Sequence, residues 1–210
     1  MADVLYKFCR KEHNLALEGT TVRIGNLNYY RAYEDQEIGD IQEGVKSYEG
    51  NIDTQEALVN FHHMSPFNLI FSATMDPNTG LAEYDSCYKI NDPVKFSQIL
   101  AFELLENIRL KDVTGIGFDE FETQEQVAEI GVEIERRKMN YLREDEITEE
   151  HYKSHHIPFW KSIRYSPQQE FRFLFKFFVG NHPAFSSTYL DFVDLDLSKK
   201  KNELPIEICY

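Results

Sequence analysis

Three segments of this chain place charged residues among aromatic residues, and they are the candidates for chemistry. The segments are Leu5–Phe8 with Lys7, Val22–Arg31 with Arg23, Tyr30 and Arg31, and Lys161–Phe175 with Glu170 and Arg172. Glu170 opens a strongly apolar run, and Arg172 follows two residues later, so both side chains share one face of a strand. For Lys7, Arg23 or Arg172 alone, the commoner interpretation is an outward position on an amphipathic strand, paired with a surplus carboxylate.

Other kinds of active site have no readable motif here. The sequence contains no GxGxxG, Walker, HExxH or GxSxG pattern, which removes the recognisable nucleotide-binding, zincin and serine-hydrolase classes. The pairs His62-His63 and His155-His156 are adjacent, so their side chains point to different faces of a strand or helix. No carboxylate recurs beside them at ligand spacing, and we expect no metal site.

The elements that must position these residues are mostly strands. Four β-prone segments are expected to form the central sheet: Leu5–Phe8, Val22–Leu27, Phe67–Met75 and Phe171–Val179. Asp92-Pro93 is a helix start, because aspartate caps and proline suits the first turn. Thr123 begins a capping box, and apolar residues behind it predict a long acidic helix over Thr123–Leu142.

Helices and strands do not alternate regularly, so the expected class is α+β with a central mixed or antiparallel sheet and flanking helices. No linker-like tract, repeat or low-complexity segment interrupts residues 1–210. We therefore expect a single domain.

The charge balance restricts the partners. There are 36 acidic and 22 basic residues, for a net charge of -14, and such a surface repels a phosphate backbone. Sequence-independent nucleic-acid binding is therefore not expected. Fifteen Asp and Glu against six Lys and Arg fall within Ala101–Glu150. This region is either a solvated helical surface or an acidic decoy for a basic protein that grips nucleic acid.

The cysteines and apolar runs suggest a compartment. Cys9, Cys87 and Cys209 are an odd number at wide spacing without a CxxC pair, as expected of reduced thiols in the cytoplasm, or the host cytoplasm if a phage encodes the chain. We expect all three thiols to be free. No apolar run is long enough to cross a bilayer, and no signal peptide is readable.

Taken together, the segments resemble a family of bacteria and phages called domain of unknown function 2971. The resemblance is carried by Leu5–Phe8 (LYKF) and by the pattern K-x3-Y-x4-E-F-R, which begins at Lys161 and ends at Arg172. It extends from about Leu5 to Phe178. The chain departs from the family at Asn28–Arg31 (NYYR), where F-N-D-P is usual.

A more distant resemblance supplies an activity. The order of strand, short helix, glycine, strand and a late strand opened by glutamate is similar to the core of ADP-ribosyltransferases, which use NAD. That resemblance implies that Glu170 is catalytic, that Lys7 takes the first-strand position, and that Arg23 or Arg31 binds phosphate beside a stacking Tyr30. Arg172 joins this substrate-binding set. Lysine replaces the usual arginine or histidine at position 7 and cannot form a bidentate fork.

Two functions follow as hypotheses. The first is an ADP-ribosyltransferase-like protein that uses NAD to modify a macromolecule in conflict between phage and bacterium. The alternative is a non-catalytic acidic protein that binds and inhibits a basic nucleic-acid-handling or defence complex. The position of the charge discriminates them, because an enzyme needs a basic, aromatic site within an acidic body, whereas a decoy needs a continuous acidic face.

Overall fold

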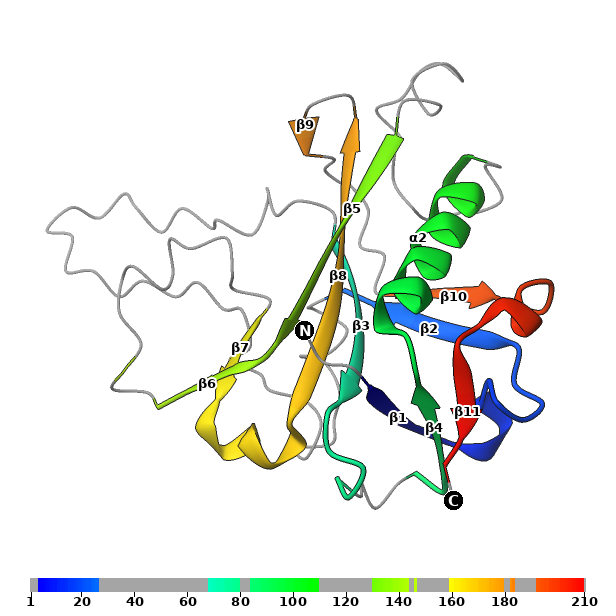
Figure 1. Cartoon of the computed structure of the whole chain (residues 1–210). Coiled ribbons are helices and arrows are strands. Elements are labelled where there is room, and N and C mark those ends of the chain that lie inside the picture. Colours follow the sequence, from blue (N-terminus) through cyan, green and yellow to red (C-terminus); the bar gives the residue numbers. More distant parts are fainter. Residues whose placement is uncertain are drawn as a thin grey trace, which may run out of the picture.

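The computed structural model describes residues 4–26, 68–79, 84–109, 130–143, 146, 159–179, 182–183 and 192–209. Within these residues the fold is α+β and dominated by an antiparallel sheet, as the sequence predicts (Figure 1). Nine of the described strands form that sheet: β1 (Leu5–Cys9), β2 (Thr21–Gly25), β3 (Asn68–Thr74), β4 (Ser86–Ile90), β5 (Ile130–Lys138), β8 (Glu170–Val179), β9 (His182–Pro183), β10 (Phe192–Asp196) and β11 (Ile206–Ile208). The small parallel pair β6 (Asn140–Leu142) and β7 (Trp160–Ser162) lies beside it.

Strand β3 joins the two parts of the sheet. It pairs with β8 from Asn68 to Thr74, and β5 lies on the other side of β8. The opposite edge of β3 is shared, because β2 pairs with it at Ile70 and β1 pairs with it at Thr74 (Figure 1). From there the sheet continues through β10 on one side and through β4 and β11 on the other. Strands from the N-terminal part of the chain (β1 and β2) and from its C-terminal part (β8) therefore meet at β3.

The core forms where helix α2 (Pro93–Arg109) covers one face of this sheet. The ring of Phe96 lies 5.4 Å from that of Phe71 on β3 and 6.3 Å from that of Phe173 on β8, measured between centroids. The predicted start of this helix is confirmed, since Asp92 Oδ1 accepts a hydrogen bond of 2.9 Å from the Lys95 amide. Odd-numbered residues of β8 face this core, so Glu170 and Arg172 face the other side.

The long acidic helix predicted over Thr123–Leu142 is wrong wherever the structure describes it. Residues 130–142 form β5 and β6 instead, and residues 123–129 lie outside the described part. The apolar side chains at 130, 132 and 134 alternate with glycine and glutamate, which is the period of a strand. The spacing of Ile130, Ile134 and Tyr141 also fits one face of a helix. The segment forms a strand because β5 pairs with β8 along its whole length.

Three short helical turns complete the described fold. They are η1 (Lys11–His13), η5 (Ile163–Gln168) and η6 (Lys201–Glu203). The turn η5 matters for the site, because it leads directly into Glu170. Between η5 and β8, Gln169 has φ 45° and ψ 40°, the left-handed conformation that non-glycine residues rarely adopt.

Candidate functional site: a buried carboxylate at the start of β8

Glu170 stands at the first position of β8 and is almost enclosed, with 7% of its surface exposed. Its Oε1 accepts a hydrogen bond of 2.6 Å from Arg172 Nε, and its Oε2 accepts one of 3.2 Å from Lys161 Nζ. Both cationic side chains are themselves buried, at 1% and 3% exposure. Glu170 thus lies between two buried cations, and we call these three residues the Glu170 cluster (Glu170, Lys161 and Arg172).

The backbone around Glu170 is fixed by neighbouring elements. Its amide donates a hydrogen bond of 2.8 Å to the hydroxyl of Tyr141 on β6, and its carbonyl accepts one of 2.9 Å from the Met139 amide. One residue earlier, the carbonyl of Gln169 accepts a hydrogen bond of 3.0 Å from the Met75 amide. These bonds hold the left-handed turn at Gln169, which aims the glutamate side chain toward Arg172 and Lys161.

The charges around it keep Glu170 ionised. Burial alone raises the pKa of a carboxyl group, but here the charge of Arg172, the charge of Lys161 and the hydrogen bond from Arg172 outweigh it. The pKa of Glu170 is therefore held well below its usual range. Such a carboxylate has no proton to give near neutral pH, so its chemistry is to accept hydrogen bonds and to stabilise positive charge.

Lys7 lies at the point where β1 and β2 share the edge of β3. Its Nζ donates a hydrogen bond of 2.8 Å to the carbonyl of Ser72, and it stands 4.9 Å from the ring centroid of Phe71. Ser72 is the residue of β3 that faces Arg172 in the β3–β8 register. Burial lowers the pKa of Lys7, while the charges of Cys9 and Glu170 raise it in part. The first strand thus brings a cation close enough to Glu170 for the two charges to interact.

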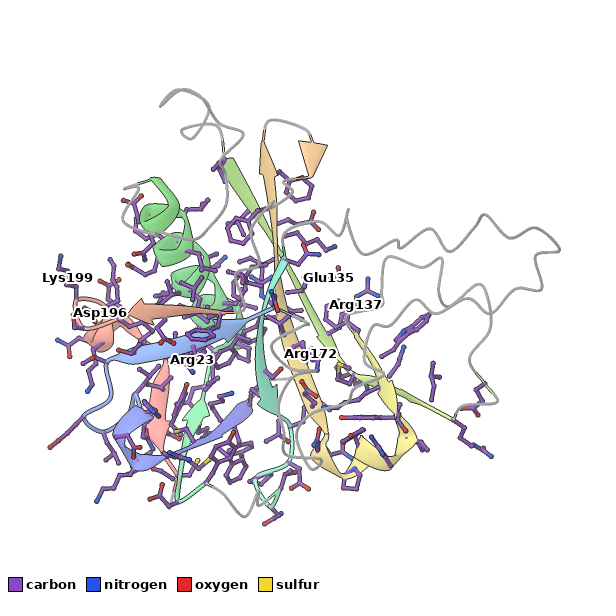
Figure 2. All side chains as sticks on the ribbon, turned by 180° about the vertical axis from the view of Figure 1, so that it is seen from behind. Arg23, Glu135, Arg137, Arg172, Asp196 and Lys199 are labelled. Carbon is purple, nitrogen blue, oxygen red and sulfur yellow. The ribbon has the colours of Figure 1, made fainter. Side chains whose placement is uncertain are left out.

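Arg23 is placed differently. It projects from β2 and makes a bidentate pair with Asp194 of β10, with Nε–Oδ1 and NH2–Oδ2 distances of 2.8 and 2.7 Å. Its guanidinium also lies 3.8 Å from the ring centroid of Phe192. Figure 2 shows Arg23 at β2 and Arg172 at β8, on different parts of the sheet. The structure engages Arg23 in a cross-strand surface pair and does not join it to the Glu170 cluster.

Of the expected site residues, the structure brings Glu170 and Arg172 into direct contact, whereas Lys7 contacts Ser72 and Phe71 of β3. Tyr30 and Arg31 lie outside the described residues. Sequence reasoning left out Lys161 and Tyr141 as site residues. Lys161 carried a signal, since it opens the same K-x3-Y-x4-E-F-R pattern, whereas Tyr141 was hidden by the wrong assignment of its segment to a helix.

In the described ranges, no group of three or more His, Cys, Asp or Glu side chains is arranged to hold a metal ion. Among the same residues, no helix is both long and apolar enough to cross a membrane.

In the comparison with known proteins, no family model, no curated protein and no solved structure matches this chain.

Proposed function

We propose that this chain is an ADP-ribosyltransferase-like protein that uses NAD to modify a macromolecule in conflict between phage and bacterium. The observation that carries the proposal is an ionised carboxylate at the start of a late strand, with a cation of the first strand within range of its charge. Glu170 on β8 and Lys7 on β1 are that pair, and they are 163 positions apart in the sequence.

The chemistry asked of Glu170 is electrostatic. Cleavage of NAD breaks the bond between the nicotinamide nitrogen and the ribose carbon, and positive charge builds on the ribose as the neutral ring leaves. A nucleophile of the target macromolecule then forms the new bond at that carbon and gives up its proton. A carboxylate fixed beside the ribose lowers the energy of this oxocarbenium-like state.

The contacts of Glu170 suit a fixed carboxylate. An ionised carboxyl group accepts about four hydrogen bonds, and Arg172 and Lys161 supply two of them. A ribose hydroxyl is a further donor of the kind this group accepts. Arg172 and Lys161 are positioning residues in this proposal, because they hold the charge and orientation of Glu170. Lys7, with Arg31 and Tyr30 as expected partners, would hold the diphosphate and the departing ring.

A second candidate function is favoured by the enclosure of the same cluster. Both cations that pair with Glu170 are buried, so the same contacts also fit a purely structural role inside the sheet. In this alternative the chain is a non-catalytic acidic protein that binds a basic nucleic-acid-handling or defence complex through its surface carboxylates, including those of Ala101–Glu150.

The deciding experiment incubates the full chain with NAD labelled in the adenylate part and with bacterial lysate. Nicotinamide release and label on macromolecules are measured for wild type and Glu170→Gln. We expect Glu170→Gln to lower both rates about 10²–10³-fold, because it removes charge stabilisation made chiefly in the transition state. Lys7→Ala should first raise the NAD concentration needed for half-maximal rate.

The control must match the loss of stability, because glutamine removes the negative charge that two buried cations contact. Leu100→Ala serves, since Leu100 is a fully buried residue of α2 and its truncation costs about 2–5 kcal/mol. Retention of activity in Leu100→Ala and its loss in Glu170→Gln support the transferase. A wild-type chain that neither consumes NAD nor labels any component overturns it in favour of the acidic binding protein.

A further inference from the structure

Two cysteines that are 122 positions apart meet at the C-terminal edge of the sheet. The Sγ atoms of Cys87 and Cys209 lie 2.7 Å apart, and both residues are partly exposed. Cys87 belongs to β4, whereas Cys209 directly follows β11. Neither residue belongs to the Glu170 cluster, so this pair is independent of the function proposed above.

The strand register makes this approach a property of the backbone. β11 pairs with β4 antiparallel at Ile206–Ile90, Glu207–Lys89 and Ile208–Tyr88, and the next opposed pair is Cys209–Cys87. The Cys209 amide donates a hydrogen bond of 3.2 Å to the Cys87 carbonyl. In such a hydrogen-bonded pair the Cα atoms are about 5.5 Å apart, which is within the usual range of a disulfide.

Neighbouring contacts hold both strands in this register. The side chains of Lys89 and Glu207, two opposed pairs away on the same face, form an ion pair of 2.6 Å. The buried amide of Asn14 donates to the Cys87 carbonyl at 3.0 Å and to Ser86 Oγ at 2.7 Å. Closing a Cys87–Cys209 bond therefore requires little movement of the backbone.

We propose that Cys87 and Cys209 are a reversible oxidation site, at which a low-molecular-weight disulfide converts the two thiols into an intramolecular disulfide that ties β11 to β4. The Cys209 thiolate attacks one sulfur of the reagent, forming a mixed disulfide and releasing one thiolate. Cys87 then loses its proton and attacks the Cys209 sulfur, and the second reagent thiolate leaves. The protein loses two hydrogens and two electrons, and the reagent disulfide is reduced to two thiols.

The order of attack follows from the surroundings of the two sulfurs. Burial and the hydrogen bond to Cys209 raise the pKa of Cys87, so Cys87 keeps its proton longer and acts second.

The third cysteine, Cys9, is an internal control. Cys9 is buried toward the core at 8% exposure, and burial raises its pKa to about 11. We therefore expect Cys9 to remain a thiol.

The test treats the reduced full chain with oxidised glutathione, removes the reagent, unfolds the chain and alkylates the remaining thiols. Intact mass should show three alkylated thiols before treatment and one after it. A non-reducing digest should contain one linked peptide pair, with Cys87 and Cys209. The Cys9→Ala chain should lose the same two thiols, whereas Cys87→Ser and Cys209→Ser should form no intramolecular bond.

Other outcomes overturn the proposal. They are retention of all three thiols, glutathione left as a stable mixed disulfide on either cysteine, or a linked pair that contains Cys9. Hydrogen exchange provides a second readout, because the tether should slow exchange of the amides of β11. Equal exchange in reduced and oxidised chains would contradict a tether even if the bond forms.

Discussion

At the scale of single residues, the buried charges of the Glu170 cluster depend on one another. Arg172 and Lys161 are buried beside one carboxylate, and each contacts a different oxygen of it. Breaking a buried pair by removing one partner is more damaging than the pair is stabilising, because the remaining charge stays out of water. We therefore expect that loss of the Glu170 charge destabilises the fold.

We predict that Glu170→Gln lowers the free energy of unfolding by about 3–5 kcal/mol at pH 7. Urea denaturation followed by fluorescence measures it. The matched control is Asp194→Asn, which breaks the exposed pair with Arg23 and should cost at most about 1 kcal/mol. Equal effects of the two variants would show that burial does not set the strength of the Glu170 contacts.

The same residue gives a prediction for pH. The pKa of Glu170 is lower in the folded chain than its ordinary value of 4.5, so the unfolded chain takes up this proton first as the pH falls. Its contribution to stability is complete above pH 4.5 and is lost progressively below it. The difference in stability between wild type and Glu170→Gln should therefore narrow from pH 5 toward pH 3 in urea titrations. A difference that widens with acid would contradict the lowered pKa.

At the scale of elements, the turn at Gln169 sets the direction in which β8 presents Glu170. A left-handed conformation costs a residue with a Cβ roughly 1–2 kcal/mol, whereas glycine adopts it without strain but loses about 0.5–1 kcal/mol of entropy. We predict that Gln169→Gly leaves stability unchanged or raises it by up to about 1 kcal/mol. Gln169→Val should lower it by more than 1 kcal/mol, since β-branched residues fit this conformation poorly.

Gln169→Ala is the control for the lost side chain, because it removes the amide but keeps a Cβ. Midpoints of urea unfolding at constant slope compare the four chains. If Gln169→Gly proved as destabilising as Gln169→Val, the side chain and not the backbone conformation would be what matters there.

Sequence patterns predicted several of the helices and strands correctly and the segment 130–142 wrongly. Strong local patterns identified β1, β2, β3, β8 and α2, since β-branched and aromatic runs or a capped start are local properties. The segment 130–142 combined two periods, and only the partner strand β8, about 40 positions later, selects between them. For the site, Glu170 and Arg172 were readable from their shared face, whereas Tyr141 and the pairing of Arg23 with Asp194 depend on tertiary contacts.

At the scale of the whole molecule, the net charge of -14 acts on the folded state as self-repulsion. Raising the salt concentration from about 0.01 M to about 0.1 M shortens the screening length from about 30 Å to about 10 Å. We predict that this raises the melting temperature by about 2–4 °C, which corresponds to about 1 kcal/mol for a chain of this size. Calorimetry at neutral pH measures it, and Glu170→Gln should show the same increment because buried contacts are screened much less.

A fall in melting temperature with salt would mean that surface ion pairs such as Arg23–Asp194 outweigh the excess of like charge. The expectation of a single domain stays a prediction, and it concerns the shape of the same melting curve. One cooperative transition should accompany the shift.

The placement of β1 and β11 on either side of β4 has a mechanical consequence. Both strands run antiparallel to β4, with Leu5 and Ile206 both opposite Ile90. A force that separates the two ends of the chain pulls β1 toward the Ile90 end of β4 and pulls β11 toward the Ser86 end. Both ladders are then loaded along their length, so their hydrogen bonds must break together instead of one after another. The molecule should therefore resist stretching, because β1 and β11 are both sheared along β4 and are not peeled from it.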